Sequence, residues 1–119
     1  MGEISKLADY SRETAEIVPL KPLVMEVLQS AELRLRHINI PVGYRSKQML
    51  HMHISKRWVV LDGAMLVHRK HGVEKLVSDD QILIPSTEIH AFENVGRIPL
   101  KLVEIRTGIY LQDDELIGG

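Results

Sequence analysis

A chain of 119 residues with 45% hydrophobic side chains is long enough for one domain with its own core and too short for two. Its 15 lysines and arginines are balanced by 16 aspartates and glutamates, so a net charge of −1 creates no field that attracts nucleic acid. Disulfides and thiolate chemistry are excluded because the chain has no cysteine, and no apolar run has the length of a membrane span. We therefore expect a cytoplasmic protein without nucleic-acid or membrane partners.

The first twenty residues differ from the rest of the chain. Apolar residues between positions 4 and 17 recur at loosely helical spacing, and Pro19 and Pro22 then interrupt the pattern. We predict a short helical or extended arm with a linker over residues 1–20, followed by one domain over residues 21–119. An arm of this kind can pack on a partner subunit, and apolar outer strand faces allow a dimer interface, so we expect a homodimer.

From Leu23 onward the sequence predicts β-strands. Short runs rich in Val, Ile and Leu are bounded by turn residues, and the lack of long helical patterns between them disfavours a parallel α/β sheet. Many short strands with frequent turns favour an antiparallel sandwich or barrel. The expected strands cover residues 23–29, 32–40, 48–54, 57–63, 64–69, 73–78, 81–85, 88–94 and 100–111.

The stretch KQMLHMHISKRWVVLDG contains two histidines one residue apart, His51 and His53, ahead of a predicted strand. An H-x-H pair in a β-protein is typical of a metal site. Gly43, His51, Lys56 and Gly63 also stand at the spacing of the first cupin motif, which reads G, five residues, H-x-H, three or four residues, E, six residues, G. A lysine therefore occupies the position of that motif's glutamate.

A second segment has the spacing of the second cupin motif. His90 and Asn94 match its histidine and asparagine, and Asp80 and Thr87 replace its glycines. The following pattern, N-x-G-x-I-P-L-x-L-x-E-x-x-x-G-x-Y-L over residues 94–111, is more specific. It resembles the C-terminal cupin domain of the type II mannose-6-phosphate isomerase and mannose-1-phosphate guanylyltransferase family, and the resemblance covers residues 21–116.

The resemblance implies an all-β cupin domain over residues 21–119, a double-stranded β-helix or jelly-roll barrel. It also implies interconversion of mannose 6-phosphate and fructose 6-phosphate with a divalent metal such as zinc or manganese. The family's four metal ligands fall on Met49, His51, Lys56 and His90. Because a thioether suits Cu(I) better than zinc, and a protonated lysine has no lone pair, we expect metal binding to be weak or absent.

Three arrangements of this region are open. His53 shares a strand face with residues 49 and 51 if the strand is regular, and it would then complete a three-histidine metal site with His51 and His90. Alternatively, a local bulge turns Lys56 toward solvent. In the third arrangement Lys56 replaces the metal as a cation or, with its pKa lowered by burial, acts as a base. That pocket would bind carboxylates or phosphates through Lys56, His51, His90 and either Arg45 or Arg57.

Two functions follow from these arrangements. The first is sugar-phosphate isomerisation, an aldose–ketose conversion in which Lys56, His51 and His90 are the catalytic candidates. The alternative is a non-catalytic module that binds a small anionic sugar or acid in a cationic, metal-free pocket. In the plainest interpretation the histidines only line the barrel, Trp58 packs against the sheet, and residues 34–37 and 55–57 form charged outer strand faces.

Overall fold

A computed structural model describes residues 21–108 and 115–117, and it confirms the all-β prediction. Every regular element in these ranges is a strand, so none of them forms a helix with the length and apolarity needed to cross a membrane. The arm predicted over residues 1–20 lies outside the described residues. The strands are β1 (Leu23–Gln29), β2 (Leu33–Ile40), β3 (Met49–His51), β4 (Ile54–Asp62), β5 (Met65–Arg69), β6 (Gly72–Leu76), β7 (Gln81–Ile84), β8 (His90–Asn94), β9 (Leu100–Gly108) and β10 (Glu115–Ile117).

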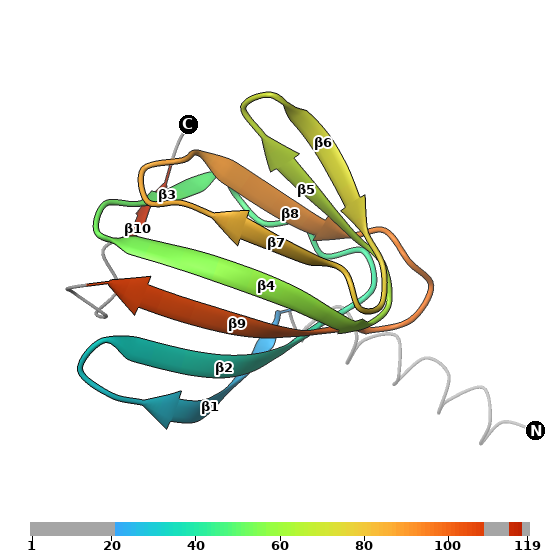
Figure 1. Cartoon of the computed structure of the whole chain (residues 1–119). Helices are drawn as coiled ribbons and strands as arrows, with labels where there is room; N and C mark the ends of the chain where they lie inside the picture. The colour runs from blue at the N-terminus through green and yellow to red at the C-terminus, as the bar shows by residue number, and fades with distance from the viewer. Residues whose placement is uncertain (1–20, 109–114, 118–119) are drawn as a thin grey trace, which may run out of the picture.

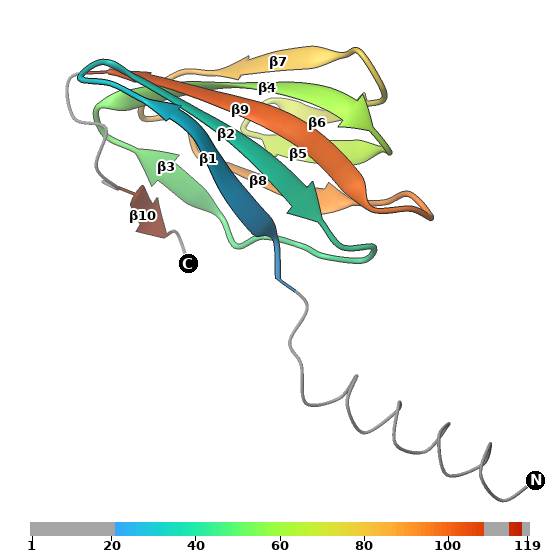
Figure 2. The same ribbon diagram turned by 90° about the horizontal axis from the view of Figure 1, so that it is seen from below.

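The strands form two antiparallel five-stranded sheets that face each other (Figures 1 and 2). The first has the order β1-β2-β9-β4-β7 and the second the order β10-β3-β8-β5-β6. Strands distant in sequence are neighbours, since β9 lies between β2 and β4, and β8 lies between β3 and β5. This is the jelly-roll arrangement that the sequence predicted.

Alternate residues of the first sheet point into the space between the sheets. In β9, Leu100, Leu102, Glu104 and Arg106 are buried, and the residues between them are more exposed. The antiparallel register with β9 places even-numbered residues of β2 and β4 on the same inner face. The buried apolar side chains between the sheets form one core. Its members are Trp58, Ile38, Ile40, Val60, Met65, Val67, Leu76, Ile82, Ile84, Leu100 and Leu102.

The run 48–54 is not one strand, as the sequence predicted, but two. β3 ends at His51, the chain bends at Met52 and His53, and β4 begins at Ile54. The two strands belong to different sheets, so the bend carries the chain across the barrel. Residues 49, 51 and 53 therefore do not share a strand face.

Within residues 21–108 and 115–117, two residues other than glycine adopt left-handed backbone angles. Asp79 has φ of 76° and Thr87 has φ of 69°. Thr87 is the residue predicted at a glycine position of the second motif. The other glycine position was predicted at Asp80, but the left-handed backbone angle is found one residue earlier, at Asp79. Asp80 instead accepts a hydrogen bond from the Val77 amide with its side chain.

β1 is an edge strand with exposed apolar side chains on both faces. Leu23 and Met25 on one face are 72% and 64% exposed, and Val24 on the other face is 48% exposed. An open edge with such side chains is a surface that natural proteins usually cover or blunt. The homodimer expected from the sequence remains a prediction.

Candidate functional site

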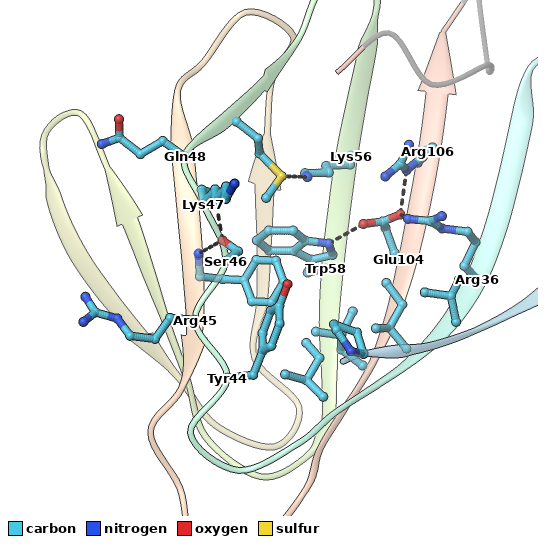
Figure 3. A pocket seen from close by; sticks show the side chains of 17 residues that line it. Arg36, Tyr44, Arg45, Ser46, Lys47, Gln48, Lys56, Trp58, Glu104 and Arg106 are labelled. Carbon is cyan, nitrogen blue, oxygen red and sulfur yellow. Dashed lines mark hydrogen bonds and ion pairs between the residues drawn. The ribbon is translucent and has the colours of Figure 1, made fainter. Parts of the chain in front are cut away.

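A cavity of about 410 Å³ lies between the sheets at one end of the barrel. Inward residues of β1, β2, β4 and β9 form one wall, and residues 44–49 with Phe92 of β8 form the other (Figure 3). Its volume is within the range of roughly 300–1,000 Å³ that is common for small-molecule sites. The described residues that line it are Pro22, Val24, Arg36, Ile38, Ile40, Tyr44, Arg45, Ser46, Lys47, Gln48, Met49, Lys56, Trp58, Phe92, Leu102, Glu104 and Arg106.

Glu104 is the centre of a buried hydrogen-bond network in this wall. Its Oε1 accepts hydrogen bonds from Arg36 Nε at 2.9 Å and from Arg106 Nε at 2.6 Å. Its Oε2 accepts from Trp58 Nε1 at 2.8 Å. The register explains the network, because Glu104 stands opposite Arg36 on β2 and opposite Trp58 on β4. Both carboxylate oxygens are therefore engaged (Figure 3).

The pKa of Glu104 reflects two opposing effects. Burial raises it, while the positive charges of Arg106, Lys56 and Arg36 and the Trp58 hydrogen bond lower it more, to about 2 from an ordinary 4.5. Glu104 is thus a carboxylate at any pH at which the protein would work. The negative charge of Glu104 therefore stands among the positive charges of Arg106, Lys56 and Arg36.

Lys56 points into the barrel and is 2% exposed. It pairs in regular register with Arg106 on β9 and Ile84 on β7, so the bulge that would turn it to solvent is not formed. Its Nζ lies 3.2 Å from His51 Nε2, 3.6 Å from Met49 Sδ and 4.6 Å from the centre of the Trp58 ring. An imidazole nitrogen, a thioether and an aromatic face are all surroundings that favour an ammonium.

The two motif histidines lie behind Lys56 and do not line the cavity. The rings of His51 and His90 are 6.1 Å apart, and the side chains are 2% and 1% exposed. His90 Nδ1 is 2.8 Å from the carbonyl oxygen of Glu88. Burial and the Lys56 charge lower the pKa of His90 from 6.5 to about 4, so the ring is neutral, with its proton on Nδ1. In the described part of the chain, the lone pair of His90 Nε2 has no hydrogen-bond partner.

Three other predicted site residues lie at the margin of the cavity or outside it. His53 is exposed in the bend after β3, so the three-histidine arrangement is not formed. Arg57 is on the outer face of β4, where Nη1 donates to Gln81 at 3.3 Å. Arg45 does line the cavity, but its side chain is 73% exposed and extends away from Trp58, with Nε 3.4 Å from Glu93 (Figure 3).

These side chains do not fit a divalent metal. The ammonium of Lys56 lies 3.2 Å from His51 Nε2, where it would repel a cation bound at that nitrogen. Across the described residues no three His, Cys, Asp or Glu side chains are grouped closely enough to hold a metal. Glu104 is already held by Arg36, Arg106 and Trp58. At ~4 Å and an effective dielectric of ~20, each unit of metal charge would cost about 4 kcal/mol against the ammonium.

Three charged members of the site were not predicted from the sequence: Arg36, Glu104 and Arg106. Residues 34–37 were interpreted as an outer charged face, yet Arg36 points inward and lines the cavity. The strand alternation contained the signal. Leu100 and Leu102 fix the inward phase of β9, and the same period of two assigns Glu104 and Arg106 to the inner face.

Known proteins with similar sequences and structures agree with this fold. Residues 23–118 match the model of the family described as mannose-6-phosphate isomerase C-terminal. The chain belongs to this family. Its relatives include the mannose-1-phosphate guanylyltransferase RfbM of Salmonella typhimurium, 35% identical over 83 residues, which are 70% of this chain and 17% of the relative. The mannose-1-phosphate guanylyltransferase of Escherichia coli K12 is 32% identical over 84 residues, 71% of this chain and 18% of the relative.

This member of the family thus spans less than a fifth of the length of these relatives. Solved structures share its fold at low sequence identity. A double-stranded β-helix protein from Klebsiella pneumoniae has a TM-score of 0.73 at 18% identity, covering 87% of both chains. A cupin-superfamily sugar phosphate isomerase from Silicibacter pomeroyi has a TM-score of 0.65 at 17% identity, covering 76% of this chain and 66% of that one.

Proposed function

We propose that this cupin domain binds a small organic anion, a sugar phosphate or an acid, in its cavity without a metal. The observation that carries the proposal is the position of Lys56, whose buried ammonium lies where the family resemblance places a metal ligand. Of the described lining residues, five are cationic and one is a carboxylate. An anion entering the cavity therefore meets an excess of positive charge in a partly dehydrated space, where charge-assisted hydrogen bonds are strong.

The donors for such an anion are in place. Glu104 binds the Nε side of Arg106, and in the described part of the chain the terminal nitrogens Nη1 and Nη2 of Arg106 make no hydrogen bond. Lys56 brings a second positive charge to this wall from the inward position of β4 just before Trp58, with Nζ 3.2 Å from His51 Nε2 and 3.6 Å from Met49 Sδ. Arg106 and Lys56 are cross-strand partners. Two cationic groups side by side suit one carboxylate or phosphate between them.

Isothermal titration of the full chain with inorganic phosphate, mannose 6-phosphate and acetate tests this proposal. We expect at least one anion to bind, and Lys56→Met to weaken its binding at least tenfold. Arg57→Met is the matched control, because Arg57 is the next residue on β4 and faces outward. Failure of every anion to bind, or equal losses in the two variants, would reject the proposal.

A second candidate is aldose–ketose isomerisation of a sugar phosphate. The family match over residues 23–118 favours it, as does the Lys56–His51 pair, in which an ammonium could polarise a carbonyl oxygen while an imidazole moves the proton. Binding is the better supported function because His51 stands behind Lys56 and outside the cavity lining. Conversion of mannose 6-phosphate, assayed with and without added zinc or manganese, decides it. Turnover no greater than that of a His51→Ala control would exclude the reaction.

A further inference from the structure

We infer that the ligand of this cavity is an amphiphilic carboxylate, an acid carried on an aromatic or hydrocarbon body, and not a hexose phosphate. The inference rests on the proposed anion-binding function and specifies the class of its ligand. It follows from the unequal chemistry of the two sides of the cavity and from the few neutral polar groups on its walls.

One side of the cavity is hydrocarbon. Trp58 and Phe92 pack edge to face with ring centres 5.3 Å apart, and Tyr44 lies 5.9 Å from Phe92. Aliphatic side chains of β1, β2 and β9 continue this surface (Figure 3). Burying apolar ligand surface against such a wall is favourable, because that surface is removed from water. A hydroxyl group placed there would lose its hydrogen bonds to water without replacing them.

Side chains that can accept a hydrogen bond from a sugar hydroxyl are scarce. Ser46 Oγ donates to the Lys47 carbonyl at 3.0 Å and accepts from the Phe92 amide at 2.9 Å. Glu104 is engaged at both oxygens. Among the described lining side chains, the neutral polar groups that remain are the Tyr44 hydroxyl and the Gln48 amide, and Gln48 extends away from Trp58 (Figure 3).

The cavity is therefore rich in donors and poor in side-chain acceptors. Lysine and arginine donate hydrogen bonds and accept none. A carboxylate is the complementary group, since it accepts only. The several hydroxyls of a hexose each need an acceptor as well as a donor, and a site without them disfavours such a ligand.

Trp58 connects the cationic and the hydrocarbon surfaces. Lys56 Nζ lies 4.6 Å from the centre of its ring, its Nε1 donates to Glu104, and its ring and that of Phe92 meet edge to face. A carboxylate held by Lys56 thus has its attached carbon body directed along Trp58. The distance between charge and hydrocarbon that the ligand must bridge is short, which fits a simple aryl or alkyl acid.

The test is isothermal titration of the full chain with three such acids: benzoate, phenylacetate and hexanoate. Each is compared with its neutral amide, with acetate, which is a carboxylate that carries only a methyl group, and with mannose 6-phosphate. We expect at least one of the three acids to bind at least tenfold more tightly than acetate and than mannose 6-phosphate, and its amide to bind at least tenfold more weakly. Lys56→Met should remove the preference for acid over amide, and Arg57→Met should leave it unchanged.

The ligand comparison needs no variant, so the inference can be judged even if Lys56→Met does not fold. Tighter binding of mannose 6-phosphate than of all three acids would overturn the inference and leave the anion-binding proposal intact. Equal affinity for acetate and the three acids would also overturn it, because the hydrocarbon wall would then contribute nothing. Binding of no anion at all would remove both proposals.

Discussion

The inner face of the first sheet has two ends that are built differently on the same strands. At one end Val60 and Leu100 are completely buried and belong to the same core cluster as Met65 and Val67 of the opposite sheet. At the other end, β4 and β9 place Lys56, Trp58, Glu104 and Arg106 in equivalent inward positions, and a cavity remains. On β9 the change takes place between Leu102 and Glu104.

The difference lies in how each end depends on its members. Apolar groups contribute to stability roughly in proportion to the area each one buries. Buried charges are stable only as a complete set, because each one's dehydration cost is offset by its partners. The apolar end should therefore lose stability gradually under substitution, and the charged end should lose much of it when one member is removed.

The largest effect is expected for Glu104→Gln. Loss of this carboxylate leaves the buried Arg106 and the partly buried Arg36 without their counter-charge, and we expect a loss of about 4 kcal/mol in the free energy of unfolding. Urea denaturation at pH 7 measures it. Glu26→Gln is the control, since Glu26 pairs with Arg34 at the surface of the same sheet and should cost below about 1 kcal/mol. Similar losses in the two variants would contradict the comparison.

At the apolar end, Leu100→Ala should cost about 3 kcal/mol, because it leaves a cavity around a side chain that is 0% exposed. This loss should be the same at pH 7 and at pH 5, since the side chains packed there do not titrate. The same denaturation experiment at both pH values is the measurement. A loss that changes with pH would show that the two ends are coupled.

Acidification should act on the charged end first. His90 is neutral in the folded protein with a pKa of about 4, and 6.5 is its ordinary value. As the pH falls below 6.5, His90 becomes protonated in the unfolded chain but stays neutral in the folded protein. The free energy of unfolding therefore decreases from about pH 6.5 down to about pH 4. We expect this loss to be about 2 kcal/mol. Glu104 adds its own loss only in a lower window, from pH 4.5 down to about 2.

The variant that isolates the histidine is His90→Asn. Its amide can replace Nδ1–H as donor to the Glu88 carbonyl but does not titrate. We expect a constant offset in stability and a smaller decline between pH 6.5 and 4.5 than in the unsubstituted protein. Parallel declines in the two proteins would assign the acid sensitivity to other groups.

The smallest effect is expected at Thr87, in the loop between β7 and β8. The Thr87 amide donates to the His51 carbonyl at 2.6 Å, and its φ of 69° is unfavourable for a β-branched residue. Thr87→Gly should raise the free energy of unfolding by about 0.5–1 kcal/mol, the relief of strain less the entropy that glycine adds to the unfolded chain. Thermal denaturation of this variant and of a neighbouring control, Ser86→Gly, shows whether the substitution stabilises the protein. Destabilisation by Thr87→Gly would mean that the threonine side chain contributes to packing.

Much of the fold could be predicted because it depends on local patterns. Alternating apolar residues identified the strands of the jelly roll, and turn residues separated them. The error at residues 48–54 shows the limit of that reasoning. A continuous apolar pattern does not reveal that His51 and Ile54 belong to different sheets, because sheet membership is decided by partners distant in sequence.

The site was harder to predict for the same reason. Spacing identified His51, Lys56 and His90, which the barrel does bring together. It could not identify Glu104 as the partner of Arg36, since these residues are 68 positions apart and meet only through the pairing of β2 with β9. Arg57 was chosen for its charge alone, and strand alternation places it on the opposite face from Lys56.

Trp58 has one more consequence, which is optical. It is the chain's single tryptophan, so indole emission from the protein arises at one point of the cavity wall. The carboxylate of Glu104 at its nitrogen and the ammonium of Lys56 at its face are charges that shift and quench that emission. Ligand entry and loss of the charged network should therefore each change the spectrum of the unlabelled protein, and the molecule carries its own fluorescent reporter at the site.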